Sequence, residues 1–287
     1  MSNHDEATGV ATDSILDIQT LTPHIGAEVR GIDLGQPLGN DEFSALYQAW
    51  LDWKVLVFRD QHLDREQHKA FGRRFGSLHV HPMQHSYGGD PEVLAVKTTA
   101  KSAYTAGDGW HTDVTCDEIP PLGSMLYVTE TPEVGGGDTL YADMYLAYEM
   151  LSDTMKDMLE GLTAIHDGAR PYMGSYKVAP PDGDKYPKNE HPVIVTHPET
   201  GKKLLYVNSG FTTRIKGMAP WESEMLLDGL TNFIATTPKL TCRVRWEPNT
   251  LVFWDNRCTQ HHAVWDYYPH SRYGERVSIV GTERPAA

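Results

Sequence analysis

The sequence has few cysteines and fewer basic than acidic residues. Its three cysteines, Cys116, Cys242 and Cys258, are unevenly spaced, so we exclude a disulfide framework and expect reduced thiols in a cytoplasmic protein. The 25 basic and 39 acidic residues give a net charge of −14. This balance argues against nucleic-acid binding, which needs a basic patch.

Long apolar segments are also missing. No run of about 18 apolar residues is present, which excludes a transmembrane helix. The N-terminal stretch MSNHDEATGVATDS has neither the basic start nor the apolar run of a secretory signal. We therefore expect a small molecule as the partner, and neither nucleic acid nor a membrane.

Apolar periodicity and polar caps predict four helical regions. They are residues 40–53, a helix capped by Asp64 that continues through Phe75, a region of about 143–162 interrupted near Ser152, and a helix that starts at Pro220 and continues through Phe233. These helices do not alternate regularly with strands, which argues against a parallel sheet.

Most of the remaining apolar segments are short and strand-like. They are residues 54–58, 124–129, 138–142, 192–197, 203–208, 240–246, 250–255 and 276–281. This pattern predicts a mainly β protein with flanking helices, a sandwich or jelly roll. We expect a loose N-terminal tail (1–16) and one domain (17–287). Within it, the Gly- and Pro-rich segment of about 168–190 is long enough to be a lid.

The stretch GWHTDVT, residues 109–115, places a histidine and an aspartate one residue apart. If this stretch is a strand, His111 and Asp113 point to the same side, because side chains alternate with a period of two. The pair then presents an imidazole and a carboxylate to one point and needs a third group to form a metal site.

The C-terminal third supplies candidates for that group. His261 and His262 are expected just past a strand and are followed by Arg272 and Arg276. Two imidazoles and a carboxylate on one face of an octahedral metal leave three positions open, which suits non-haem Fe(II) with a chelating cosubstrate and O₂. A zinc hydrolase that uses the same three residues is an alternative, as is a cupin-like binding or storage protein that has lost its metal.

Several stretches resemble the taurine dioxygenase (TauD/TfdA-like) family of Fe(II)- and 2-oxoglutarate-dependent oxygenases, which also includes alkylsulfatases and phenoxyalkanoate dioxygenases. They are FGSLHVHP (75–82), WHTDVT (110–115), PEVGGGDTLYADM (132–144), HPVIVTHPETGKKLLYVNSGFTTRI (191–215), RVRWEPNTLVFWDNRCTQHHAVWDY (243–267) and RYGERVSIVG (272–281). They occur in the family's order. The resemblance implies a double-stranded β-helix, a cupin-like jelly roll, with Fe(II) as cofactor and 2-oxoglutarate and O₂ as cosubstrates.

The resemblance also implies the metal ligands. The HTD motif assigns His111 and Asp113, and the stretch WDNRCTQH assigns His261 as the distal ligand. His262 stands where relatives often have tyrosine, so it is expected in the pocket wall or behind the ligands.

Cosubstrate binding is implied for three further residues. Arg272, eleven positions after His261, matches the arginine that grips the C5 carboxylate of 2-oxoglutarate, and a guanidinium can do so bidentately. Thr139 of GGGDT matches a threonine that adds its hydroxyl to the same carboxylate. Arg276 matches a second arginine near the other end of the cosubstrate and the substrate.

Substrate contacts are implied for His81, Gln84, Val114, Phe211 and Arg276. Gln84 replaces a tyrosine and Gly107 an asparagine that face the amine of taurine, so taurine itself is not the expected substrate. Further apolar side chains near the expected pocket, which allow a bulkier substrate, are Tyr172, Met173, Tyr176 and Trp265.

We therefore expect hydroxylation of an unactivated C–H bond in a small to medium organic substrate other than taurine, with release of succinate and CO₂. The substrate is expected to carry an anionic end, namely a sulfonate, a sulfate ester or a carboxylate. A bulkier apolar natural product is the alternative substrate. Relatives are commonly dimers or tetramers, so a homo-oligomer is expected.

Overall fold

The computed structural model describes residues 15–81, 89–180 and 185–287. Its largest element is a seven-stranded sheet with the order β1-β2-β3-β13-β5-β15-β4. In this sheet β2 and β3 run parallel and the other neighbours antiparallel. The strands are β1 (Asp17–Thr20), β2 (Ala27–Arg30), β3 (Val55–Phe58), β4 (Leu94–Thr98), β5 (Gly123–Glu130), β13 (Thr250–Asp255) and β15 (Arg272–Ile279).

A smaller sheet faces it and completes the sandwich. Its strands are β12 (Thr241–Val244), β6 (Thr139–Asp143) and β14 (Thr259–Ala263), in that order. Tyr141 and Val244 from the small sheet share one buried core with Val57 and Val252 from the large sheet. The two packed sheets confirm the predicted jelly roll.

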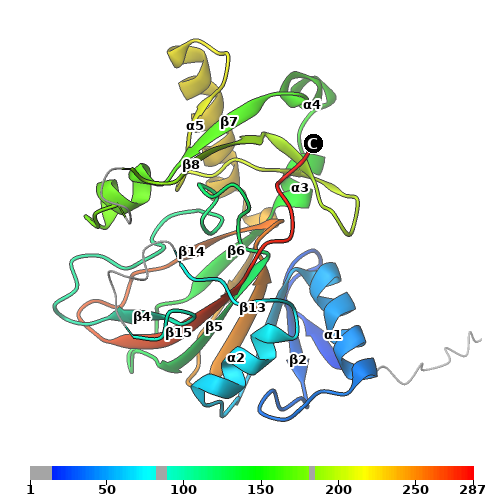
Figure 1. Ribbon diagram of the computed structural model, residues 1–287, viewed down its shortest axis with the longest axis vertical. Helices are drawn as coiled ribbons and strands as arrows, with labels where there is room; N and C mark the ends of the chain where they lie inside the picture. The colour runs from blue at the N-terminus through cyan, green and yellow to red at the C-terminus, as the bar shows by residue number, and fades with distance from the viewer. Residues whose placement is uncertain (1–14, 82–88, 181–184) are drawn as a thin grey trace, which may run out of the picture.

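Two helices cover the outer face of the large sheet, α1 (Asn40–Trp53) and α2 (Arg65–Arg73) (Figure 1). Trp50 of α1 is fully buried and stacks on Phe253 of β13, with ring centroids 4.4 Å apart and planes within 8°. Burial of two large rings in parallel contact makes this helix–sheet contact a main source of packing energy.

The rest of the chain lies at the other end of the sandwich (Figure 1). It contains the sheet β11-β7-β8 and the hairpin β9-β10. Its elements are α3 (Met144–Glu149), α4 (Asp153–Leu159), β7 (Thr163–Asp167), a π-helical turn (Arg170–Ser175), β8 (Lys188–Pro192), β9 (Ile194–Thr196), β10 (Lys203–Leu205), β11 (Thr212–Ile215), α5 (Pro220–Thr236) and a 3₁₀ turn (Pro238–Leu240). Most of these elements share one apolar core with the small sheet, whereas Tyr172 of the π-helical turn packs in a separate cluster with Val114 and Phe211.

The predicted helix signals are confirmed. The Asp64 side chain accepts a hydrogen bond from the Gln67 backbone at the start of α2, as a capping box requires. The region of about 143–162 is two helices, because Ser152 caps a new helix, α4. Helix α2 ends at Arg73, two residues before the predicted Phe75.

Other predictions need correction. Residues 109–115 are not a strand: His111 forms one isolated bridge and Asp113 lies in a turn. His261 and His262 lie within β14 rather than past a strand. Of the expected tail, residues 1–14 lie outside the described part, but Leu16 is already packed in the core.

Seven short strands were not predicted, namely β1, β2, β4, β7, β8, β11 and β14; β8 overlaps the predicted strand 192–197 only at Pro192. The three cysteines are free and buried. Among the described residues, no helix combines the length and apolarity needed to span a membrane.

Candidate active site

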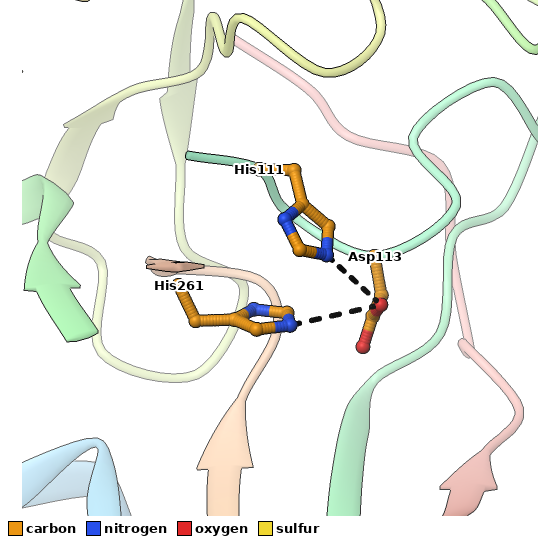
Figure 2. A group of neighbouring side chains, drawn as sticks. All are labelled: His111, Asp113 and His261. Atoms are coloured by element: carbon orange, nitrogen blue, oxygen red, sulfur yellow. Dashed lines mark ion pairs between the residues drawn. The ribbon is translucent and has the colours of Figure 1, made fainter. Parts of the chain in front are cut away.

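Three side chains from two segments converge near the sandwich core. Nε2 of His111 and Nε2 of His261 lie 3.7 Å and 3.9 Å from Oδ1 of Asp113, and Figure 2 shows their polar ends turned toward one another. The ligand atoms of all three lie within 4.8 Å of one another. Two imidazole nitrogens and a carboxylate oxygen on one side form the donor set of a facial metal site.

Main-chain hydrogen bonds bring the two histidines together. The His111 N–H donates to the His261 carbonyl at 3.0 Å, and the His261 N–H donates to the His111 carbonyl at 2.8 Å. His261 is held in turn by the pairing of β14 with β6. After Asp113 the chain turns sharply, with Val114 at a φ of 51°.

The carboxylate of Asp113 is buried and charged. Its Oδ1 accepts a hydrogen bond from Arg276 Nη1 at 2.7 Å, and its Oδ2 accepts one from Ser124 Oγ at 3.1 Å. Burial raises the pKa of Asp113, but the charge of the nearby Arg276 guanidinium outweighs it, together with the hydrogen bond from Ser124, and holds the pKa below its ordinary range. The Asp113 carboxylate is therefore anionic at neutral pH.

Both histidines of the triad are neutral. Burial lowers the pKa of His111 and lowers that of His261 well below its ordinary value, because the interior disfavours the charged imidazolium. His111 Nδ1 lies 2.9 Å from the Gly109 carbonyl. A carbonyl accepts, so Nδ1 carries the proton, and the Nε2 lone pair faces Asp113, as a metal ligand requires.

Arg272 is a buried cation whose charge is not fully matched. Only 3% of its surface is exposed, and its Nε and Nη2 have no hydrogen-bond partner among the described residues. Its guanidinium lies 5.1 Å from the ring of Trp246, whose Nε1–H donates to Thr139 Oγ1 at 3.0 Å. Burial lowers the pKa of Arg272. Two free N–H groups in fork geometry fit a carboxylate, so this end of the site fits a carboxylate-bearing cosubstrate.

One cavity of about 270 Å³ joins these groups. Of the residues predicted to contact substrate, His81, Val114, Phe211 and Arg276 line it, together with the three candidate ligands, Thr139 and Arg272. Gln84 lies outside the described residues. Burial, followed by the charge of Arg276, lowers the pKa of His81 to about 3, so His81 is neutral.

Of the four further apolar side chains predicted near the pocket, two line the cavity and two do not. Tyr172 and Tyr176 line the cavity, and the Tyr176 hydroxyl accepts a hydrogen bond from the Gly107 N–H at 3.1 Å. Met173 is 57% exposed and does not line it. Trp265 packs against Tyr268 and is not part of the cavity wall.

His197, Asp255 and Cys258 form a second buried cluster. His197 Nδ1 accepts hydrogen bonds from the N–H groups of Glu199 and Thr200, so its proton sits on Nε2, which faces Asp255. Asp255 is also held on both oxygens by Arg257. Both ring nitrogens of His197 are therefore occupied by hydrogen bonds to described residues, and neither is available to bind a metal ion.

Comparisons with known proteins identify the family of this chain. The family model described as "Taurine catabolism dioxygenase TauD, TfdA family" matches residues 17–278. The chain belongs to this family. It is 35% identical to an alkylsulfatase from Acinetobacter baylyi, over 93% of this chain and 85% of that protein. It is 34% identical to an alpha-ketoglutarate-dependent sulfonate dioxygenase from Saccharomyces cerevisiae, over 94% and 68%.

A solved structure agrees as well. The chain superposes on a putative alpha-ketoglutarate-dependent taurine dioxygenase from Burkholderia xenovorans with a TM-score of 0.82 and 35% identity, covering 95% of this chain and 94% of that chain. This TauD/TfdA-family protein is thus a 2-oxoglutarate-dependent dioxygenase, whose family uses Fe(II), 2-oxoglutarate and O₂.

Two residues that the sequence did not indicate hold Asp113 in place. The Asp113 N–H donates to Asn256 Oδ1 at 2.8 Å, and Asn256 Nδ2 donates to the Asp113 carbonyl at 3.0 Å. Ser124 holds the side chain of the same residue. Asn256 was within the WDNR stretch already noted for the distal ligand, so the motif was a usable signal, whereas Ser124 had none.

Proposed function

We propose that His111, Asp113 and His261 bind the ferrous ion, and that Arg272 and Thr139 bind the C5 carboxylate of 2-oxoglutarate. The Nε–H and Nη2–H of buried Arg272, which have no partner among the described residues and lie in the same cavity as the triad, carry this proposal. A buried cation without a partner is costly, and a bound carboxylate would remove that cost. We assign Arg276, which lines the same cavity and donates to Asp113, to the other end of the cosubstrate and to the substrate.

The bound ferrous ion, with 2-oxoglutarate and O₂, supplies the oxidising power: the substrate C–H becomes C–OH, and 2-oxoglutarate becomes succinate and CO₂. The protein's own residues set the geometry. Neutral imidazoles and an ionised Asp113 would hold the ion, Arg272 would orient the cosubstrate, and the rings of Tyr172, Tyr176 and Phe211 would exclude water from the wall of the cavity.

The charges favour a substrate with one anionic end. With a divalent ion and a doubly charged cosubstrate bound, Asp113, Arg272 and Arg276 leave the site with one net positive charge. Neutral His81 can donate one N–H, and the Val114 backbone lines the same region. We propose a sulfonate, a sulfate ester or a carboxylate at this position, attached to an alkyl or aryl body that packs on the aromatic wall.

The size of the cavity supports this substrate over the bulkier apolar alternative. Pockets for small molecules typically enclose about 300–1,000 Å³, and this cavity of about 270 Å³ must also hold the cosubstrate. A polycyclic natural product would require the wall formed by Tyr172 and Tyr176 to move. Taurine is disfavoured because Gly107 adds no polar side chain to the cavity.

A substrate screen tests the proposal. The purified protein with Fe(II), 2-oxoglutarate and O₂ is offered hexyl sulfate, hexanesulfonate, taurine, phenoxyacetate and an uncharged polycycle, and succinate and hydroxylated product are measured together. Stoichiometric product from one of the non-taurine anions supports it. Turnover of only the uncharged compound would remove the anionic end from the proposal.

A metal test separates the dioxygenase from a zinc hydrolase on the same three residues. Activity that requires Fe(II) and 2-oxoglutarate, with O₂ consumed, supports the assignment. Activity with Zn²⁺ that requires neither 2-oxoglutarate nor O₂ would contradict the dioxygenase assignment. The proposed roles of Thr139 and Arg272 in cosubstrate binding would then fall away. A protein that binds neither metal would instead be a cupin-like binding protein.

We also propose that the protein acts in the cytoplasm as a single domain (17–287) with a lid at about 168–190. Three buried, unpaired thiols suit a reducing compartment. Its acidic net charge suits a small-molecule substrate rather than nucleic acid. The expected homo-oligomer, a dimer or a tetramer, is tested by light scattering, and a monomeric mass would contradict it.

A further inference from the structure

The turn after Asp113 has a strained backbone. Val114 has a φ of 51°, is 2% exposed and lines the cavity. A β-branched residue is rarely found at positive φ because its Cβ crowds the backbone. Such a conformation persists only where the surroundings hold it. The residues that hold this turn therefore control the shape of the cavity beside the metal ligands.

Strand β8 holds the turn from behind. The Nε2 of His191 lies 3.0 Å from both the Thr115 and the Asp117 carbonyl oxygens, and because carbonyls only accept, Nε2 carries a proton that both share. Asn189 Nδ2, on the same strand, donates to the Cys116 carbonyl at 2.7 Å. Three successive carbonyls of the turn are thus fixed by two β8 side chains.

The Thr115 side chain is held as well. Its Oγ1 lies 2.9 Å from His166 Nδ1 on β7 and accepts from Asn208 Nδ2 at 3.2 Å. His166 and His191 are fully buried, and burial lowers the pKa of both. They are neutral, so they act as fixed hydrogen-bonding groups rather than charges.

Asp113 is held by different contacts. Asn256 holds its backbone N–H and carbonyl, and Ser124 and Arg276 hold its carboxylate. None of these contacts comes from β8. The metal ligand and the turn that follows it are therefore fixed from two sides.

We propose that His191 is a positioning residue for substrate: it fixes residues 114–117 against the cavity, while Asn256 separately fixes Asp113 for the metal. This division of roles rests on the proposed function, since it assumes that the triad binds the metal and that Val114 faces the substrate. It predicts that the two substitutions affect different ligands.

The test compares His191→Leu, His191→Gln and Asn256→Ala in the full chain. Leucine removes the shared N–H, whereas a glutamine amide supplies two N–H groups and can restore it. Mn(II) affinity is measured by calorimetry and backbone hydrogen exchange over 113–117 by mass spectrometry. The KM is measured for whichever sulfonate, sulfate ester or aryloxy acid the screen selects.

For His191→Leu we expect faster exchange in the turn and a KM raised on the order of 10-fold, with Mn(II) Kd within about threefold of wild type. Asn256→Ala should raise the Mn(II) Kd by about 10–100-fold, because removal of a residue that hydrogen-bonds to a metal ligand typically weakens metal binding by that factor. His191→Gln should recover most of the KM. The matched control is His68→Leu, because His68 is equally buried but packs against Tyr127 on the far face of the large sheet.

Three results would overturn the proposal: His191→Leu behaving like His68→Leu in every readout but stability, an equal loss of Mn(II) affinity in the His191→Leu and Asn256→Ala variants, or no rescue by glutamine. If His191→Leu does not fold, Asn189→Ala replaces it, with the same pattern expected at smaller amplitude. Hydrogen exchange and Mn(II) binding are measured without substrate. A failed substrate screen would therefore refute the proposed substrate class, whereas these two measurements would still test the role of His191.

Discussion

Replacement of Arg272 by methionine tests the cosubstrate subsite. The guanidinium is 3% exposed and has two unpartnered N–H groups, on Nε and Nη2, among the described residues. A charge-assisted hydrogen bond is worth about 1.5–3 kcal/mol, so losing both costs about 3–6 kcal/mol. At 1.4 kcal/mol per tenfold, we expect the Kd of 2-oxoglutarate to rise by roughly 10²–10⁴-fold. Arg272→Lys keeps the charge but loses the fork, which predicts a loss of about 10–10²-fold.

The assay is calorimetric titration of 2-oxoglutarate into the Mn(II)-loaded protein, with thermal unfolding of the metal-free protein measured beside it. Methionine removes a buried charge, so the metal-free Arg272→Met variant should be no less stable than wild type. Arg243→Met is the control, because the Arg243 side chain is 55% exposed and pairs with Asp138, and neither residue lines the cavity. A cosubstrate Kd within threefold of wild type, or a large loss of stability without ligand, would refute the subsite.

Three further predictions concern other groups. Asp113→Ala should abolish Fe(II)-dependent turnover and lower the stability of the metal-free protein by about 3–5 kcal/mol in chemical denaturation, because Arg276 loses a buried partner; unchanged Mn(II) binding would contradict it. Gly107→Val should weaken Mn(II) binding, since a Cβ at this φ of +83° lies 3.1 Å from His111 Cε1, whereas equal affinity in a titration would show that the ring has room. Burial lowers the pKa of His68 from 6.5 to about 4. In the unfolded chain His68 is therefore protonated below about pH 6.5, whereas in the folded chain it is protonated only below about pH 4. Stability should therefore fall with acidification in that window, and His68→Leu should flatten the slope by up to about 1.4 kcal/mol per pH unit; identical slopes in denaturant titrations at several pH values would contradict this.

Local signals in the sequence were sufficient for the helices. Helix α1 begins at Asn40 and ends at Trp53, where the apolar spacing predicts it, because one helix face must contact the sheet. The unpredicted strands are short, and β1 and β4 are only partly buried. Their pairing depends on neighbours far along the chain, which no local window contains.

The candidate site likewise combines features that the local sequence predicts with features that only the fold determines. The identities of His111, Asp113 and His261 follow from motifs, and the structure brings them together. The strand expected for the HTD motif was wrong because Val114 takes a left-handed conformation that its own side chain disfavours. That conformation depends on His191, 77 positions after Val114 in the sequence, so only the folded chain shows it.

The reciprocal main-chain hydrogen bonds between His111 and His261 mean that backbone atoms set the distance between these two imidazoles. Mutations can then alter the aromatic wall, which belongs to the 170–176 segment and to Phe211, while His111 and His261 keep their spacing. A fold built in this way can acquire a new substrate without rebuilding its oxidation chemistry.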